Sequence, residues 1–555
     1  MKTSYYLFAT FVYLLSILLG FSFSELLSKN GDGSYKKELV KPDGYITANQ
    51  YRIDVLHYQL KFDLDTENKI LTGESEIRLI LTAHTDTIDL NLHDNLKVSE
   101  LYVNGRAALY LQKNKRLGIV IRDAGLNEGD TAMISIRYQG TPKREGFAAF
   151  SFGKINGNSL VYTLSEPVYA SNWFPCNDRP DDKAFADVII GNDSSQISVS
   201  LGRLINVETK GNKRYYHWKS AYPVSTYLIS IYSSGYSKIS DQYISVTGDT
   251  IPLEYYVLPN QVEKAKIDFS EHNRMLEVFE KLFGPYPFPE DKYGVAVFLW
   301  QMGAMENQTI TGVGSNFITG TRSHSSLLAH ELAHHWWGNS VSPREWKDIW
   351  LNEGFASYSE ALYAEQTDGR AALIADMANR YSQFFIEKLY NPQDKFSSTV
   401  YEKGAYVLHM LRRETGDTNF FEIIKKYHEK FIYSNASVSD FIILAQEISG
   451  MNLGQFFEQW VFRGTGGIIC DYTWKNDLTD SGRKLAVHLT QVQKGYPGYI
   501  FPLDLKITYG DGSTEIITRK ITSNDQILEI DVKMPVKSIE PDPEKWLFGE
   551  FRLKK

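Results

Sequence analysis

The sequence is poor in cysteine and lacks basic runs, and each shortage removes a class of protein. Only two cysteines occur among 555 residues, Cys176 and Cys470, too few for a disulfide scaffold or for a zinc site made of thiolates. Any metal site must therefore use histidine and carboxylate ligands. The two cysteines lie far apart in the sequence, and we expect two separate buried thiols rather than a bridge. The formal net charge of −8 argues against a nucleic-acid-binding surface.

The N-terminus has the order of regions found in a secretory signal peptide. Lys2 precedes an apolar run, Tyr5–Leu19, and the small residues Ser22 and Ser24 follow it. This order predicts cleavage after Ser24 and export, either to the periplasm or as a secreted protein. The apolar run is nearly long enough to span a bilayer, so an uncleaved membrane anchor is the alternative. No cysteine stands directly after the run, which excludes a bacterial lipoprotein anchor.

Hydrophobic periodicity predicts a multidomain α+β protein. Alternation of apolar and polar residues predicts an N-terminal antiparallel β-domain, and a helical period then predicts a mostly helical catalytic domain. Alternation returns afterwards and predicts a small C-terminal β-sandwich. The predicted divisions are a signal peptide, 1–24; a linker, 25–45; the β-domain, 46–238; the catalytic domain, 239–464; and the sandwich, 465–555.

Local signals predict individual elements within these domains. Long amphipathic helices are expected over Val262–Leu282 and Ala371–Leu389, and Ser437 or Ser439 is expected to cap a later helix. The pairs Asn104-Gly105 and Asn156-Gly157 and the sequence Tyr509–Gly512 predict tight turns.

The segment HELAH, His330–His334, predicts a metal-binding helix. Two histidines four residues apart project from one helix face and can share one metal ion. Glu331 is then aimed at the open side, where a metal-bound water would lie. Glu353 stands 19 residues after His334 in a second predicted helix, and a helix–loop–helix of that spacing can return its carboxylate to the two imidazoles. This His₂Glu set with an open fourth position is the donor set of a catalytic zinc site.

The limits of the HELAH helix and the role of its third histidine are also predictable. Ser323 or Ser325 can cap the start, and Gly338-Asn339 can end the helix in a left-handed residue. His335 lies on another face, so we expect it to pack or to support the site rather than to bind metal. The motif alone also fits a solvated helix face with two ordinary histidines, and only its context favours a metal site.

Zinc in such a site lowers the pKa of its bound water and polarises a carbonyl group. Glu331 would take the proton of the water during attack and pass it to the departing amine. The tetrahedral oxyanion needs one further donor besides zinc.

A further motif, GAMEN at Gly303–Asn307, lies 23 residues before His330. Together with HELAH, the 18-residue gap and Glu353, it makes the chain resemble the aminopeptidase N family of gluzincin zinc metallopeptidases. The resemblance extends over nearly the whole predicted mature chain, through the segments Tyr58–Leu81, Ser165–Ala184, Tyr222–Leu228, Tyr401–Ala405 and Phe456–Trp460. It implies a thermolysin-like catalytic domain, one Zn²⁺ per chain and hydrolysis of N-terminal residues from peptides.

The resemblance also implies roles for particular residues. Glu306 would bind the free α-amino group of the substrate, and Glu166 would offer it a second carboxylate. Two carboxylates facing a cationic terminus accept charge-assisted hydrogen bonds and block a chain that continues past the amine. Tyr401 would donate its phenol to the oxyanion. The other residues of the motif are implied as substrate contacts, with backbone pairing by the first two: Gly303, Ala304, Met305 and Asn307.

The sequence departs from the family pattern in three places. Leu164 and Ser171 stand where many members carry Gln and Arg, which puts the side-chain preference in doubt. The sequence ends at Lys555 without the C-terminal helical domain of longer members, so a short form is expected. Its cleft would be more open, or would be covered by a second subunit, which leaves a homo-oligomer open.

Three alternative functions remain. An endopeptidase could use the same zinc chemistry, but Glu306 and Glu166 argue against it. An epoxide hydrolase, an activity of one branch of the family, carries GGMEN where this chain has GAMEN. A catalytically silent zinc-binding surface protein would be expected to lack Glu331 or Tyr401, and both are present.

Overall fold

The computed structural model describes residues 46–155, 157–382, 384–479 and 482–554. The predicted signal peptide, residues 1–24, the predicted linker, 25–45, and Asn156 of one predicted turn lie outside these ranges. The chain forms two compact units: one holds the chain up to Trp346 with His428–Ala436, and the other holds Lys347–Tyr427 with the chain from Ser437 onward. The predicted domain boundaries stay predictions.

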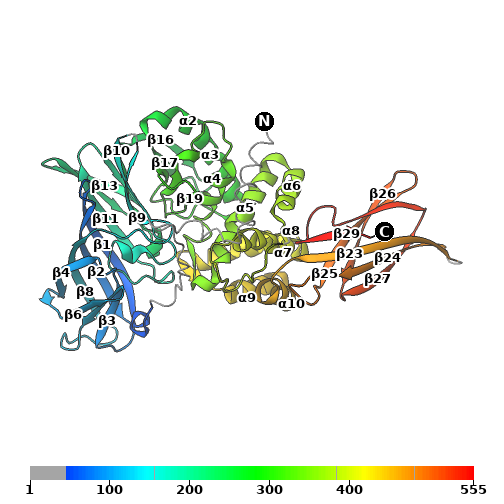
Figure 1. The fold of residues 1–555 in the computed structure, drawn as a ribbon, viewed down its shortest axis with the longest axis horizontal. Coiled ribbons are helices and arrows are strands. Elements are labelled where there is room, and N and C mark those ends of the chain that lie inside the picture. The colour runs from blue at the N-terminus through cyan, green and yellow to red at the C-terminus, as the bar shows by residue number, and fades with distance from the viewer. Residues whose placement is uncertain (1–45, 156, 383, 480–481, 555) are drawn as a thin grey trace, which may run out of the picture. The chain divides into compact units, whose positions relative to one another are not determined.

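An eight-stranded sheet dominates the first unit (blue to cyan in Figure 1). Its strands pair antiparallel except for one parallel pair between β1 and β11. In sheet order the strands are β13 (Arg203–Lys210), β14 (Lys213–Lys219), β11 (Phe185–Asp193), β1 (Ile53–Asp65), β2 (Ile70–Leu81), β8 (Thr131–Gly140), β4 (Leu96–Val103) and β5 (Arg106–Ala107).

The alternation of apolar and polar residues in the sequence matches the two faces of this sheet. Alternate residues of β1, including Tyr58, Leu60 and Phe62, are fully buried on one face, as period-two alternation requires. Asn104 and Gly105 both have positive φ in the turn between β4 and β5, which confirms that predicted turn. The strand-rich N-terminal region is therefore confirmed.

Smaller sheets complete the strand-rich part of the first unit. One has the order β12 (Ile197–Val199), β15 (Tyr232–Ser234), β10 (Asn158–Leu164) and β9 (Ala149–Ile155), and another β3 (Thr87–Asn91), β7 (Arg116–Val120) and β6 (Tyr110–Lys113). Two short strands pair in parallel: β21 (Val341–Pro343) and β22 (Ser434–Ala436).

A five-stranded mixed sheet carries the GAMEN segment at its edge. Its order is β16 (Ser237–Ile244), β17 (Thr250–Val257), β18 (Tyr293–Phe298), β20 (Thr311–Gly314) and β19 (Ala304–Met305). The helices of this part are α2 (Val262–Asp268), α3 (His272–Phe283) and α4 (Ser325–Ala333). The helix predicted over Val262–Leu282 is thus interrupted by a 3₁₀ turn at Phe269–Glu271. The break follows Asp268, whose buried carboxylate accepts the N–H groups of Thr319, Gly320 and Arg322.

Helices and a C-terminal pair of sheets make up most of the second unit. The helices are α5 (Trp350–Asp368), α6 (Arg370–Arg380), α7 (Gly404–Thr415), α9 (Val438–Ser449) and α10 (Gly454–Phe457), with π-helical turns at Thr399–Lys403 and Glu458–Arg463; α8 (Asp417–Phe431) runs across the division between the units. The sheets have the orders β27 (Asp525–Val532), β24 (Gly482–Gln491), β23 (Ile468–Thr479), β29 (Gly549–Leu553) and β26 (Thr514–Ile521), β25 (Phe501–Tyr509), β28 (Val536–Pro541).

Two predicted elements of this unit have different outcomes. Ser437 caps α9 in a capping box with Asp440, as predicted. The helix predicted to reach Leu389 ends at Arg380. Two of the apolar residues that extended its pattern, Phe385 and Leu389, are buried outside any helix, and Phe385 stacks on Phe548.

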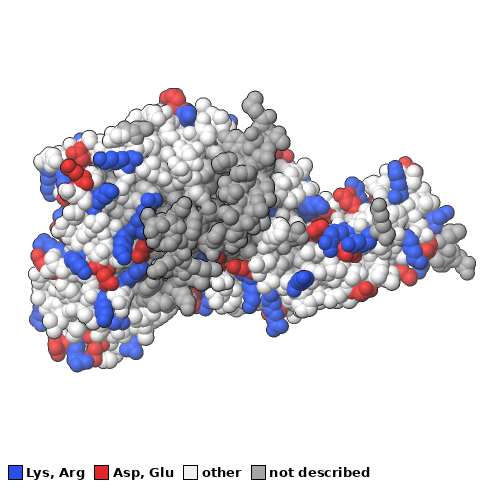
Figure 2. All heavy atoms as spheres, in the orientation of Figure 1, with Lys and Arg blue, Asp and Glu red and all other residues white. Residues whose placement is uncertain are grey.

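The surface charges and the two cysteines are as the composition predicts. On the face drawn in Figure 2, basic and acidic side chains are interspersed over the parts that are not grey. Cys176 and Cys470 are both buried and free, as expected. Within the described residues, no helix combines the length and apolarity needed to cross a bilayer.

Candidate metal centre and substrate site

Helix α4 and the turn that follows it hold the two histidines of HELAH. His330 lies in the last turn of α4, and His334 is its C-cap. Their Nε2 atoms are 3.1 Å apart. Two nitrogens bound to one tetrahedral zinc ion at the usual Zn–N distance are about 3.3 Å apart. The pair is therefore spaced to bind one ion through Nε2.

The orientation of His334 is set by the main chain. Its Nδ1 lies 2.9 Å from the carbonyl oxygen of Trp337, so Nδ1 carries the proton that it donates. The lone pair of a neutral imidazole then lies on Nε2, which faces His330. Support of this kind from the far ring nitrogen is general for metal-binding histidines.

The helix is shorter than the sequence predicts. It ends at Ala333, not at Gly338, because the bulky residues after it form tight turns, with His335 N–H bonded to the Leu332 carbonyl at 3.0 Å. Gly338 has a φ of 116°, so the expected positive φ is confirmed. The predicted serine caps are wrong: His324 occupies the N-cap, and Ser325 donates its hydroxyl to the Arg322 carbonyl.

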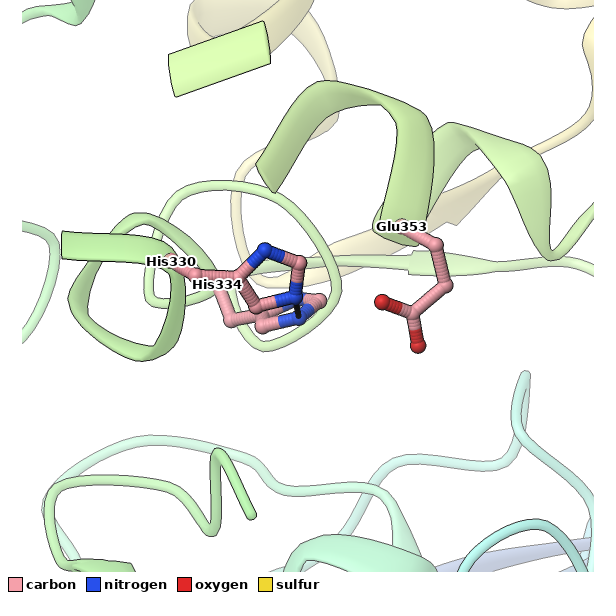
Figure 3. A group of neighbouring side chains, drawn as sticks. All are labelled: His330, His334 and Glu353. Atoms are coloured by element: carbon pink, nitrogen blue, oxygen red, sulfur yellow. Dashed lines mark hydrogen bonds between the residues drawn. The ribbon is translucent and has the colours of Figure 1, made fainter. Parts of the chain in front are cut away.

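Glu353 is the acidic residue of the first turn of α5. Its carboxylate and the imidazoles of His330 and His334 each offer one ligand atom, and these atoms lie within 4.8 Å of one another. All three side chains are buried, and Figure 3 shows the Glu353 carboxylate turned toward the two rings. Two nitrogens and a carboxylate oxygen match the donor set of catalytic zinc, so the residues fit the metal that the sequence predicts.

A second acidic group adjoins the first. Glu166 and Glu306, both buried in the first unit, each place a carboxylate oxygen within 4.8 Å of the other and of a Glu353 oxygen. Glu306 directly follows β19, the edge strand formed by Ala304 and Met305. Because β19 pairs only with β20 among the strands of the described residues, its other edge can pair with an extended peptide.

Asn307 completes the GAMEN motif inside the core. Its Oδ1 accepts the Tyr232 hydroxyl at 2.6 Å. Burial raises the pKa of Tyr232 well above its usual range, with Tyr236 and then Glu331 and Glu306 adding to the effect. Tyr232 is therefore a neutral donor that fixes Asn307. Met305 is also buried, and the predicted substrate contacts of these two residues stay predictions.

His335 has both ring nitrogens occupied by the protein. Nε2 accepts the backbone N–H of Thr309 at 3.0 Å, and Nδ1 lies 3.3 Å from the carbonyl oxygen of Glu331. Burial lowers the pKa of His335 to about 3, so the ring is neutral. His335 thus ties the metal-binding helix to the chain after GAMEN, which confirms the expected supporting role.

Two supporting residues escaped the sequence analysis. The Asn339 amide donates to the Glu306 carbonyl at 2.7 Å. Lys183 Nζ donates to the carbonyls of Asn339 and Ser340 at 2.6 and 2.9 Å. Both side chains bond to main-chain atoms far away in sequence, and no sequence motif predicts such contacts.

Tyr401 lies in the π-helical turn Thr399–Lys403, which runs directly into α7. This turn and α7 both contact α5, the helix that carries Glu353. The buried glycines Gly354 and Gly404 meet where α5 and α7 approach each other: a Cβ added to Gly404 would lie 2.8 Å from the Cα of Gly354. Contacts that close are open only to glycine, so this pair brings the two helices together.

A histidine pair and a carboxylate on two helices, with an acidic pair beside a strand edge, define a metallohydrolase-type centre. The family models agree. The "Peptidase M1 N-terminal domain" matches residues 55–228, and the "Peptidase family M1 domain" matches residues 267–460. The chain belongs to the M1 family of zinc metallopeptidases, as the resemblance to aminopeptidase N predicted.

Relatives and solved structures point the same way. The chain is 26% identical over 66% of its length to "Probable aminopeptidase 1" of Sulfurisphaera tokodaii, covering 48% of that protein. It is 25% identical over 85% of its length to mouse "Endoplasmic reticulum aminopeptidase 1", covering 53% of it. The chain thus spans about half the length of the curated relatives it matches. The M1 zinc metallopeptidase of Deinococcus radiodurans is 26% identical, with a TM-score of 0.65 over 74% of this chain and 93% of that one.

Proposed function

We propose that the protein is an aminopeptidase that uses one zinc ion per chain to remove N-terminal residues from peptides. The observation that carries the proposal is the convergence of Glu166 and Glu306 beside the metal-binding group. A hydrolytic zinc site needs no such pair. A site that selects a substrate ammonium does, because charge-assisted hydrogen bonds to carboxylates are strong and directional.

Position on the edge strand explains why the pair selects chain ends. A peptide that pairs with β19 through Gly303 and Ala304 runs toward Glu306, the next residue after the strand. The two carboxylates then receive its α-ammonium group and leave no path for further residues. Relatives named aminopeptidase and "Leucyl aminopeptidase" support this reading, as does a neighbouring structure described as bound to a Tyr-Ser-Ala substrate.

The remaining chemistry is divided between two side chains, one glutamate and one tyrosine. Bound zinc supplies Lewis acidity, which makes water acidic near neutral pH. Glu331, which follows the first metal-binding histidine and is buried, accepts the proton of the attacking water and donates it to the leaving amine. Tyr401 donates its phenol to the oxyanion of the tetrahedral intermediate.

The test is a panel of free-amine aminoacyl arylamides and peptides, each paired with its N-acetylated form. We expect turnover of the free-amine members only, loss of turnover with a chelator and recovery with zinc. Turnover of N-acetylated peptides at equal rates would identify an endopeptidase, and no turnover of any member with zinc restored would rule out the proposal.

A variant assigns the selectivity to its residue. Glu306→Gln should lose most activity on free-amine substrates while keeping its zinc. Glu254→Gln is the matched control, because Glu254 lies in β17 of the same sheet and pairs with Lys238 at 2.6 Å. Parallel losses of zinc and activity in Glu306→Gln would mean that Glu306 has a structural role only.

Export belongs to the proposal on the strength of the N-terminal sequence. N-terminal sequencing of the protein purified from its native source should begin at Glu25. Recovery of Met1 in the membrane fraction would favour the anchored alternative.

A further inference from the structure

Arg380 joins three carboxylates from three separate elements of the second unit. It is the last residue of α6, and its side chain is 9% exposed. Its Nε donates to Asp376 of α6 at 2.5 Å, one terminal nitrogen to Glu402 at 2.8 Å, and the other to Glu360 of α5 at 3.0 Å. Every nitrogen of the guanidinium is thus used, each toward a different carboxylate.

Removing these ionic groups from water costs free energy. Burial raises the pKa of Glu402 and of Asp376 above their usual range, even though the neighbouring guanidinium of Arg380 acts to lower both. Three carboxylates around one cation also leave excess negative charge. Buried ionic groups of this kind rarely stabilise a protein more than apolar residues of the same volume would. What they supply is fixed direction, because a planar guanidinium holds each partner at a set angle.

The elements that Arg380 joins are those that carry the proposed chemistry. Glu360 lies seven residues after Glu353 in α5, so both project from nearly the same face two turns apart. Glu402 directly follows Tyr401 in the π-helical turn. A guanidinium bonded to both connects the helix of the metal-binding carboxylate to the turn of the tyrosine.

The far side of the same turn is held by a second buried basic side chain. Lys403 is fully buried, and its Nζ donates to the carbonyls of Gly464 and Glu387 at 2.5 and 3.3 Å. The residue after Tyr401 is therefore bonded to Arg380, and the next residue is bonded to two further segments. The next residue, Gly404, packs against Gly354 of α5. The three residues that follow Tyr401 are therefore each held by a contact with another segment.

We propose that Arg380 is a positioning residue that fixes the Tyr401 phenol relative to Glu353 through its bonds to Glu402 and Glu360. The inference rests on the proposed function, since it concerns the oxyanion donor of that reaction. The proposed role of Arg380 involves no contact with substrate, because it acts only through the tyrosine.

The test compares Arg380→Met in two backgrounds, the native chain and Tyr401→Phe. A misplaced catalytic group costs up to about 100-fold in rate. We therefore expect Arg380→Met to lower kcat by at least about tenfold with Tyr401 present, with a smaller change in KM and full zinc content. In the Tyr401→Phe background the same substitution should change kcat by less than about twofold, because no phenol remains to be misplaced.

A matched control separates positioning from stability. Arg412 of α7 is 4% exposed and also links to α5, but it bonds to Glu365 at 2.6 Å, at the end of α5 far from Glu353, and to Asp417 at 2.8 Å. Arg412→Met should lower the melting temperature and change kcat by the same factor in both backgrounds. Should Arg380→Met not fold, Glu402→Gln carries the same comparison, because it keeps the shape of the side chain and removes its charge.

Equal fold-losses of kcat for Arg380→Met in the two backgrounds would overturn the inference, because the residue would then act on the fold as a whole. Native kcat in Tyr401→Phe would overturn it as well, since the phenol would have no role to be positioned for. Both results leave the aminopeptidase proposal standing. An inactive native chain on every free-amine substrate would instead overturn the proposed function.

Discussion

The histidines of the metal group and its carboxylate are held in place by different means. His334 is oriented by a carbonyl three residues away, and its ring faces His330 one turn back in the same helix. Glu353 depends on partners far along the chain: Gly354 meets Gly404, and Glu360 of the same helix is bonded to Arg380. One half of the group is determined locally and the other by the packing of α5 against α7. Substitutions in the two regions should therefore fail in different ways.

The largest effect is expected inside α4. Glu331→Gln should lower kcat on the order of 10²–10⁴-fold, because it removes the general base. Zinc content should stay near one per chain, since His330, His334 and Glu353 are untouched. Single-turnover kinetics together with metal analysis measure both quantities. A variant that loses zinc along with activity would show that α4 is less locally determined than the hydrogen bonds indicate.

The predictability of the molecule follows the same division. HELAH and Glu353 are readable because helical spacing alone projects the two histidines from one face, and period-two alternation revealed strands such as β1 for a similar reason. The role of Arg380 was not readable, because two of its three partners, Glu360 and Glu402, are 20 and 22 residues away in sequence. The end of α6 was misplaced for the same cause: Phe385 continues a helical pattern but is buried against Phe548. Local periodicity cannot distinguish a helix face from a loop that is buried by tertiary contact.

A smaller effect is expected where α5 meets α7. Gly404→Ala places a methyl group 2.8 Å from the Cα of Gly354, so the helices must separate. Overpacking of this kind costs about 1–3 kcal/mol of the free energy of unfolding. We also expect kcat to fall while zinc remains bound, because Tyr401 moves with α7.

Chemical denaturation and steady-state kinetics check this prediction. The control is Gly510→Ala in the hairpin of the same unit, where the nearest atom to the new Cβ is 3.7 Å away and neither quantity should change. Native kcat in Gly404→Ala would mean that the helix separation does not reach the tyrosine.

The last effect depends on pH and involves the buried amine of Lys403. Burial lowers the pKa of Lys403 to about 7, against about 10.4 in an unfolded chain. Between these values the unfolded chain binds the extra proton, so this site makes stability rise with pH. The stability difference between the native chain and Lys403→Met should therefore grow in favour of the native chain from pH 7 to 10, by at most about 1.4 kcal/mol per pH unit.

Urea unfolding at several pH values measures that slope. The exposed Lys388 provides the comparison, and Lys388→Met should follow the native chain in parallel across the range. A parallel course for Lys403→Met as well would show that the Lys403 amine stays charged in the folded protein.

The bond from His334 to the Trp337 carbonyl has a genetic consequence. Mutation replaces side chains and leaves the main chain in place, so the codon for Trp337 does not encode the acceptor that orients this ring. A saturation screen for activity would detect the effect of losing the Trp337 indole. It would not detect the hydrogen bond from His334 to the Trp337 carbonyl. The same screen would recover lesions readily at Arg380, Gly354 and Gly404, where the side chain, or its absence, is the functional part. Substitutions that alter this site are therefore expected mainly in α5 and α7, because a side-chain change at Trp337 does not remove the carbonyl that orients His334.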